Sequence, residues 1–405
     1  MAYVSDPHVV LARPLELPCG AVLKNRLAKS AMSDSLANGR GETTPEQIRL
    51  YERWAEGGAA LSIIGEVQGD PHYAEKPGNL VIGSDSDLGT LRELVRRGTA
   101  NGTHLWPQLG HAGALAHPPI SDPKGPSALD VDGLRCKALS KADIQALPAR
   151  FARTAALARE AGFTGVQLHA AHGFLLSQFL SPLFNRRSDE YGGSIHARSR
   201  VLTEVIDAVR RAVGAAYPVG IKINSSDQLE GGLTEDEALE VVRRLDRSPV
   251  DLIDISGGTY FPGARPASDT SGDGPYFLSF AGRARMLTDK PLMTTGGFKT
   301  RSQAAGAVAS GATDMVSLAR AMVLDTKLPR SWLSEGNGDP EFPRFATSIP
   351  GGVTAWYTMR LTAIGEDRAD TFDMELESAL RTYNERDDRR CTQWRARFGP
   401  ADPPT

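Results

Sequence analysis

The stretch LMTTGGFKTRSQAAGAVASGATDMVSLAR, residues 292–320, contains the structural unit that decides the fold. Its first four residues and residues 314–318 are mostly apolar or β-branched, as in buried strands. Between them lies a helical segment, 301–309, which a pair of glycines separates from the first strand. A strand, a helix and a second strand in this order indicate two parallel strands joined by a right-handed crossover.

The same alternation runs through most of the chain. We expect strands at 26–32, 60–67, 104–109, 165–169, 219–224, 252–256, 292–295 and 314–318, and helices at 45–56, 87–99, 141–161, 197–213, 234–245, 280–287, 301–309 and 321–328. Ser140 and Thr234 are expected to cap the helices that follow them, because acidic residues occupy the first turn of each. Eight strand–helix units predict an α/β protein with a closed (β/α)8 TIM barrel, and an open doubly wound sheet is the alternative.

The length of 405 residues fits one barrel with additions at both ends, because such barrels range from about 200 to more than 400 residues. No stretch resembles a linker between domains. We therefore predict a single domain with an N-terminal cap (1–25), a barrel (26–330) and a C-terminal extension (331–405). The extension contains Trp356, Tyr357, Trp394 and Phe398, which favours its packing on the barrel over disorder.

The composition argues against several classes of protein. Lysine and arginine number 46 against 49 acidic residues, a net charge of −3, so binding of nucleic acid is not expected. No apolar stretch approaches the length of about 20 residues that crosses a bilayer, and the N-terminus lacks a signal-peptide pattern. We therefore expect a soluble, cytoplasmic protein without a membrane anchor. Cys19, Cys136 and Cys391 are far apart, which fits a reducing compartment and argues against a cysteine-ligated metal.

In a barrel of this type the functional residues lie at the C-terminal ends of the strands. The seventh and eighth strands end in Thr295-Gly296-Gly297-Phe298 and Leu318-Ala319-Arg320. Bare backbone at the glycines, a helix N-terminus and a guanidinium together favour a phosphate site. The alternative is that the glycines only form tight turns and that Arg320 pairs with a surface acid.

The fourth strand ends in His169-Ala-Ala-His172. Two imidazoles this close can bind an anion or an oxygen jointly, transfer protons or ligate a metal. We expect no metal, because there is no obvious third ligand nearby and the zinc motif HExxH is absent. The alternative is that one or both histidines are structural.

Two more polar side chains are predicted at the mouth of the barrel. Gln108, at the end of the third strand, can donate to and accept from the edge of a flat heterocycle. Lys222 lies in the apolar fifth strand and needs an electron-rich partner there. That partner is either a bound ligand or, alternatively, the carboxylate of Glu66 or Asp254. With the phosphate site, these residues indicate a planar, phosphorylated ligand.

Several longer motifs resemble one family, the old yellow enzymes, which are FMN-dependent ene-reductases and NAD(P)H:flavin oxidoreductases. The resemblance runs from about Leu23 to Leu328. It rests on LKNRL (23–27), QLGHAG (108–113), AGFTGVQLHAAHGF (161–174), QFLSP (178–182), NRRSDEYGGS (185–194) and the region from TGGF (295–298) to LARA (318–321).

The resemblance implies non-covalent FMN within the barrel, with NADH or NADPH as the reductant. It places the phosphate at Gly297, Ala319 and Arg320, and Gln108 at the pyrimidine edge. Lys222, where the family usually has arginine, would lie near N1 and O2 and stabilise the reduced ring. The remaining flavin contacts that it implies are Ser30, Ala31, Met32, Ser33 and the backbone of Val67.

The resemblance also implies a small-molecule substrate, an activated alkene or a quinone, whose oxygen is held by His169 and His172. Phe174 stands where the family has the tyrosine that protonates the substrate. Either water or another phenol replaces that acid, or the substrate needs none, or the enzyme favours dehydrogenation. The candidate phenols are Tyr260, Tyr276 and Tyr357.

Two other functions stay open on the same fold. One is a flavin-dependent dehydrogenase or demethylase reoxidised by oxygen, and the other is a non-catalytic flavin-binding protein. Family members occur as monomers and as homo-oligomers, so the oligomeric state is open too.

Overall fold

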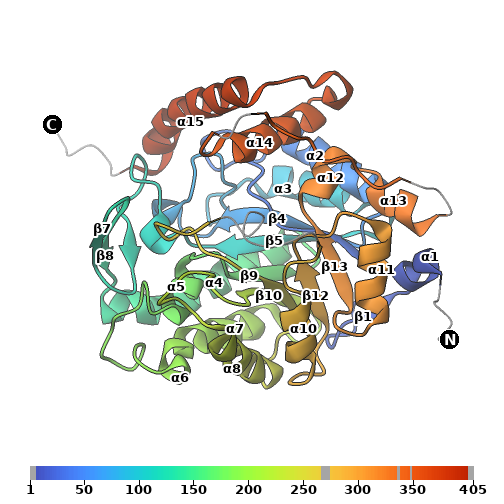
Figure 1. The fold of residues 1–405 in the computed structure, drawn as a ribbon. Coiled ribbons are helices and arrows are strands. Elements are labelled where there is room, and N and C mark those ends of the chain that lie inside the picture. Colours follow the sequence, from blue (N-terminus) through green and yellow to red (C-terminus); the bar gives the residue numbers. More distant parts are fainter. Residues whose placement is uncertain (1–5, 266–273, 335–337, 347–348, 400–405) are drawn as a thin grey trace.

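The computed structural model describes residues 6–265, 274–334, 338–346 and 349–399. Within them, eight parallel strands close into a barrel in which each strand pairs with its neighbours in chain order (Figure 1). These strands are β3 (Leu27–Lys29), β4 (Leu61–Gln68), β5 (His104–Gly110), β9 (Val166–Ala170), β10 (Val219–Asn224), β11 (Leu252–Ser256), β12 (Leu292–Thr295) and β13 (Met315–Leu318). The pairing of β13 with β3 closes the barrel. The predicted (β/α)8 barrel is confirmed, and the open sheet is wrong.

Helices follow the strands and cover the outside of the barrel (Figure 1). They are α2 (Pro45–Glu56), α3 (Leu88–Gly98), α4 (Lys141–Glu160), α7 (Arg200–Val213), α8 (Glu235–Asp246), α10 (Leu278–Arg285), α11 (Arg301–Ala309) and α12 (Arg320–Leu324). Ser140 and Thr234 form capping boxes at the starts of α4 and α8, as predicted. Each box satisfies N–H groups that the first turn of a helix leaves unpaired.

Two predicted helices are interrupted. The segment predicted at 197–213 consists of α6 (Ile195–Arg198) and α7, separated at Ser199, whose hydroxyl donates to the carbonyl of His196. Such local bonds of serine compete with the helix. The segment predicted at 321–328 stops after α12 and restarts as α13 (Leu328–Leu333), where Pro329 has no N–H to continue the helix.

Shorter elements complete the described chain. They are α1 (Pro7–Ala12), β1 (Leu15–Glu16), β2 (Val22–Leu23), η1 (Pro71–Tyr73), η2 (Ala100–Gly102), η3 (Gly113–Leu115), β6 (Lys124–Gly125), β7 (Leu129–Val131), β8 (Leu134–Ala138), α5 (Leu175–Leu180), α14 (Gly352–Gly365), η4 (Ala369–Thr371) and α15 (Leu376–Phe398).

Side chains of the barrel strands alternate between two environments. Val219, Ile221 and Ile223 of β10 belong to the main apolar core between the strands and the helices. Lys222, between two of them, points into the barrel, where it contacts side chains of other strands. A period of two along each strand therefore sends apolar residues outward and polar residues inward at the upper half of the barrel.

The lower half of the barrel interior is apolar. Trp106 fills its centre, and the neighbouring positions are glycine: a Cβ on Gly220 would lie 2.9 Å from the Trp106 ring. The hairpin of β1 and β2 packs beneath it, with Leu15 and Leu23 in the same apolar cluster. This end of the barrel is therefore sealed, and access is left to the C-terminal ends of the strands.

The C-terminal helices lie along one side of the barrel (Figure 1). Helix α14 packs against α2 and α15. From α15, Arg390 donates to the carbonyl of Ser35 at 2.7 Å, and Trp394 donates to the carbonyl of Pro71 at 3.2 Å. These bonds tie α15 to the loops that follow β3 and β4, so this helix borders the mouth of the barrel.

The sealed lower end gives a stability prediction. Leu23→Ala should lower the free energy of unfolding by about 2–5 kcal/mol, because Leu23 is fully buried beneath the barrel and its loss leaves a cavity. Val22→Ala, on the same hairpin at a residue 51% exposed, is the control and should change it by less than about 0.5 kcal/mol. Chemical denaturation measures both, and equal losses would contradict the packing described.

Candidate active site

The inward positions at the C-terminal ends of three neighbouring strands carry the predicted polar residues. Lys222 of β10 pairs in register with His169 of β9 on one side and with Asp254 of β11 on the other. Asn224 and Ser256 follow one inward position later on β10 and β11. The parallel register therefore brings residues far apart in the sequence to one level of the barrel.

A chain of buried side chains crosses the barrel at this level. Gln108 donates to Gln167 at 2.7 Å, and Gln167 donates to Asp254 at 3.0 Å. Asp254 forms an ion pair with Lys222 at 2.5 Å and accepts a bond from Thr295 at 2.7 Å. Of the two carboxylates that the sequence left open as partners of Lys222, the structure shows Asp254. Lys222 also donates to Thr295 at 3.2 Å.

The predicted flavin contacts after β3 line the rim beside this chain. Lys222 Nζ lies 3.4 Å from the hydroxyl of Ser30. Ser33 forms an isolated β-bridge with Gly65 of β4. A Cβ on Gly65 would lie 2.3 Å from the Met32 carbonyl. The backbones of the two loops are therefore in contact. Ala31 packs on the apolar cluster of the lower barrel, and Val67 is buried near the end of β4.

The predicted phosphate site is a cradle of bare backbone. Gly296 and Gly297 have φ of 119° and 79°, a region that favours glycine. A Cβ on Gly297 would lie 2.0 Å from the Gly274 carbonyl oxygen and 2.8 Å from the Tyr276 ring. Ala319 precedes α12, and Arg320 begins it. The Arg320 guanidinium lies 5.8 Å from the centre of the Tyr357 ring.

The donor set fits an FMN phosphate, because Arg320 begins α12 directly after the last barrel strand, and the glycine pair that follows the neighbouring strand carries no side chains. The structure also locates two of the candidate phenols. Tyr276 contacts the glycine pair and Tyr357 contacts Arg320, so both lie at the phosphate end of the site.

The two predicted histidines are in direct contact. His169 Nε2 lies 3.0 Å from His172 Nδ1, and His172 Nε2 lies 2.8 Å from the hydroxyl of Ser256. His172 has φ of 61°, and its N–H donates to Asn224 Oδ1 at 3.0 Å. The hydrogen bond to Asn224 supports this uncommon backbone conformation and so fixes the position of the second ring.

Both imidazoles are electrically neutral in this environment. Burial, followed by the nearby charge of Lys222, lowers the pKa of His169 to about 3. Burial, then His169 and Lys222, holds the pKa of His172 well below its usual range. A neutral imidazole carries one N–H, so the pair can offer two hydrogen-bond donors without a net charge.

An aromatic wall lies beside the histidines. The Phe174 ring centre is 4.8 Å from that of His169 and 5.9 Å from that of Tyr260. Tyr260 is 67% exposed and its N–H donates to the carbonyl of His172 at 3.1 Å. The nearby charges of Glu75 and Glu66 help to raise the pKa of the Tyr260 phenol, so it keeps its proton at neutral pH.

Two acidic residues at the site have roles that the sequence did not predict: Glu66 was considered only as a possible partner of Lys222, and Glu75 was not considered. Glu66, at the end of β4, is 4% exposed and has φ of 56°. Burial raises the pKa of Glu66 to about 8, and burial followed by the charge of Glu66 raises the pKa of Glu75 to about 7. The position of Glu66 near the end of the second strand was the available signal, but the sequence does not show that the carboxyl of Glu66 or of Glu75 is enclosed.

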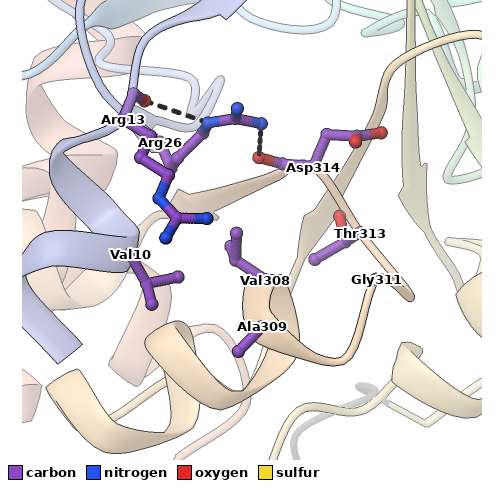
Figure 2. Close-up of a pocket in the computed structure, with 8 residues that line it drawn as sticks. All are labelled: Val10, Arg13, Arg26, Val308, Ala309, Gly311, Thr313 and Asp314. Carbon is purple, nitrogen blue, oxygen red and sulfur yellow. Dashed lines mark hydrogen bonds between the residues drawn. The ribbon is translucent and has the colours of Figure 1, made fainter. Parts of the chain in front are cut away.

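A hollow lies at the opposite end of the barrel from the candidate active site. It has a volume of about 230 Å³ and lies where β3 and β13 begin (Figure 2). Arg26 is bonded there to the carbonyls of Arg13 and Asp314, at 3.0 Å and 2.9 Å. The lining contains none of the predicted site residues and no histidine, cysteine or glutamate.

Other features of the described chain bear on the class of protein. In residues 6–265, 274–334, 338–346 and 349–399, no three His, Cys, Asp or Glu side chains are grouped so that they could hold a metal ion. Among the helices of these residues, none combines the length and the apolar character that a bilayer crossing requires.

Comparison with known proteins defines the class. The chain belongs to the NADH:flavin oxidoreductase / NADH oxidase family, whose model matches residues 11–335. It is 36% identical over 354 residues to the NADH-dependent flavin oxidoreductase iliE of Hypocrea jecorina (strain QM6a), covering 78% of this chain and 87% of that protein. The predicted membership of the old yellow enzymes is confirmed, and with it an oxidoreductase that uses FMN and a nicotinamide.

Solved structures of reductases are also similar to this chain. Morphinone reductase in complex with tetrahydroNAD is 25% identical, with a TM-score of 0.70, covering 82% of this chain and 92% of that one. A 2-naphthoyl-CoA reductase complex is also 25% identical, with a TM-score of 0.74 over 80% of this chain. This chain spans about half, 52%, of the length of that reductase.

Proposed function

We propose that this enzyme reduces an activated alkene, such as an enone or a nitroalkene, or a quinone, at the end of β9. The observation that carries this proposal is the pair of buried, neutral imidazoles, whose facing nitrogens are 3.0 Å apart. FMN, when bound, supplies the chemistry of accepting a hydride from NADH or NADPH and passing it to the substrate. The residues of the chain hold that cofactor and prepare the substrate.

The residues proposed to hold FMN occupy three sides of the barrel mouth. They are Ser30, Ala31, Met32, Ser33 and Val67 along the ring, Gln108 and Lys222 at its polar edge, and Gly297, Ala319 and Arg320 at the phosphate. Support comes from the position of Arg320 at the start of α12 and from the bond network that fixes Gln108 and Lys222. Lys222 is held at the polar edge by its buried ion pair with Asp254.

His169 and His172 are proposed to bind the substrate oxygen with one N–H each. As hydride reaches the carbon β to the activating group, negative charge develops on that oxygen. Two fixed donors in a buried site stabilise this charge, each by about 3 kcal/mol. Because both rings are neutral in the free site, they gain most from the charge that appears only during the reaction.

The remaining step is protonation of the α-carbon, and Phe174 has no proton to give. We propose Tyr260 as the donor, because its ring is in contact with Phe174 and its phenol is protonated at neutral pH. Tyr276 and Tyr357, the other candidates, lie by the phosphate cradle. The structure offers no feature that favours a dehydrogenase or a non-catalytic protein over this assignment.

The direct test is anaerobic photometry of the purified holoprotein. NADH or NADPH should bleach the flavin absorbance, and 2-cyclohexenone, a nitroalkene or a quinone should then restore it. Parallel additions of buffer in place of the second substrate control for leakage of oxygen. Bleaching that none of these electrophiles reverses would reject the proposed substrate class.

The proton-donor assignment predicts the effect of an added phenol. With Tyr260 as the donor, Phe174→Tyr should speed flavin reoxidation by 2-cyclohexenone by much less than the 10²–10⁴-fold that a general acid commonly contributes, because an acid is already present. Tyr260→Phe should slow this step, and Phe174→Tyr should restore it in the double variant. Stopped-flow absorbance measures the rates, and a Tyr260→Phe enzyme as fast as the wild type would remove Tyr260 from the mechanism.

The histidine assignment predicts a loss of ligand binding. Phenolates mimic the charged oxygen of the substrate and give a long-wavelength charge-transfer band when they stack on oxidised flavin. The double variant His169→Ala with His172→Ala should lose this band, because both donors are gone. His196→Ala, at an exposed position on α6, is the control and should keep it. A band that persists in the double variant would show that the pair is structural.

A further inference from the structure

Glu66 lies directly behind the histidine pair. Its Oε1 contacts Nδ1 of His169, on the side of the ring away from His172. Glu66 belongs to β4 and His169 to β9, so the contact reaches across the intervening strand, β5. It can do so because residue 110 is glycine: a Cβ there would lie 2.3 Å from Glu66 Oε2.

The carboxyl of Glu66 is enclosed without a full set of partners. Within the described part of the chain, neither Glu66 Oε2 nor His169 Nδ1 makes a bond of good hydrogen-bond geometry. The groups that face Glu66 are His169 from β9, Gln68 from its own strand, Glu75 from the following loop and Tyr260 from the loop after β11. Two cations act on the neighbours of Glu66: Lys222, which is paired with Asp254, acts on His169, and Lys76 acts on Glu75.

The two neutral imidazole rings have only two N–H protons between them, because each neutral imidazole carries one N–H. To bind a substrate oxygen between the rings, both of these protons must be on the inner nitrogens, His169 Nε2 and His172 Nδ1. The outer nitrogens are then bare and must accept bonds. Ser256 can donate its hydroxyl proton to His172 Nε2, at 2.8 Å. His169 Nδ1 has only Glu66 against it among the described carboxyl and hydroxyl groups.

The protonation of Glu66 therefore selects the tautomer of His169. A neutral carboxyl donates to Nδ1 and leaves the proton of His169 on Nε2, facing the substrate. A carboxylate accepts from Nδ1 and leaves the lone pair of Nε2 facing the substrate oxygen, where it repels negative charge. Burial favours the neutral acid, since it raises the pKa of Glu66 to about 8.

We propose that Glu66, as a neutral carboxylic acid, is a positioning residue that holds His169 in the tautomer able to donate to the substrate oxygen, with Ser256 doing the same for His172. This proposal rests on the proposed role of the histidine pair. Glu66 does not touch the substrate and transfers no proton to it. Its ionisation switches off one of the two donors.

The test is the pH dependence of phenolate binding to the oxidised holoenzyme. Pentafluorophenol is a suitable probe, because it is ionised throughout the range of about pH 6.5 to about pH 9.5. The binding-competent fraction falls as Glu66 ionises, so the apparent Kd of the wild type should rise about tenfold or more between about pH 7 and about pH 9.5. Titration of the charge-transfer band at each pH gives the Kd.

Glu66→Gln should remove this dependence. Its amide N–H can donate to His169 Nδ1 and does not titrate, so the Kd should stay within about twofold of its value at low pH. Glu75→Gln is the matched control, since it removes the neighbouring carboxyl and should keep the rise in Kd. Equal pH profiles in the wild type and Glu66→Gln, or a rise that disappears only in Glu75→Gln, would overturn the proposal.

Two further outcomes have a definite meaning. If Glu66→Gln does not retain FMN, the wild-type profile still decides, because a Kd that is flat with pH contradicts the titration of Glu66. If the wild type gives no charge-transfer band at any pH, the proposed function of the histidine pair fails and this inference fails with it. A band that is present but insensitive to Glu66 rejects this inference alone.

Discussion

The buried ion pair between Lys222 and Asp254 is the constraint on which the upper half of the barrel depends. The two residues are register partners on adjacent strands, and both are almost completely buried. An ion pair in such a place is stable only when further hydrogen bonds surround it, and loss of one partner costs about 3–5 kcal/mol. Gln167 and Thr295 provide those bonds to Asp254. The pair therefore fixes the side chains on both sides of it.

From this pair the electrostatics of the site follow. The charge of Lys222 lies near His169 and, together with burial, keeps both imidazoles neutral. The same lysine lies below the proposed flavin edge, so one cation acts on the cofactor side and on the substrate side. The enclosed carboxyl of Glu66 completes this arrangement behind His169. The site therefore offers two neutral imidazoles, in contact with each other, to the proposed substrate oxygen.

Much of the fold was predictable because each barrel strand carries its own evidence. Strands such as Val219–Asn224 alternate in a short apolar run, and capping residues such as Ser140 mark the helices. The breaks at Ser199 and before Pro329 were missed, because a helical pattern of apolar residues continues across them. Propensity alone does not outweigh that pattern until the local bonds are known.

The candidate site was also predictable only in part. His169, His172 and Gln108 were predicted because motifs place them at strand ends; the structure brings the two histidines into contact and bonds Gln108 to Gln167. The partner of Lys222 was left open, since only the register with Asp254 decides between two carboxylates. The contact of Glu66 with His169 was beyond reach, because it depends on the left-handed backbone at Glu66 and on the space above Gly110. Neither is encoded in a local pattern.

The central claim is that both imidazoles donate to one substrate oxygen. A crystal structure of the oxidised holoenzyme with a bound phenol tests it most directly. The account predicts that the phenol oxygen lies within hydrogen-bond distance of His169 Nε2 and of His172, in place of the 3.0 Å contact between the two rings. A phenol stacked on the flavin with its oxygen elsewhere, and the contact between the rings intact, would contradict it.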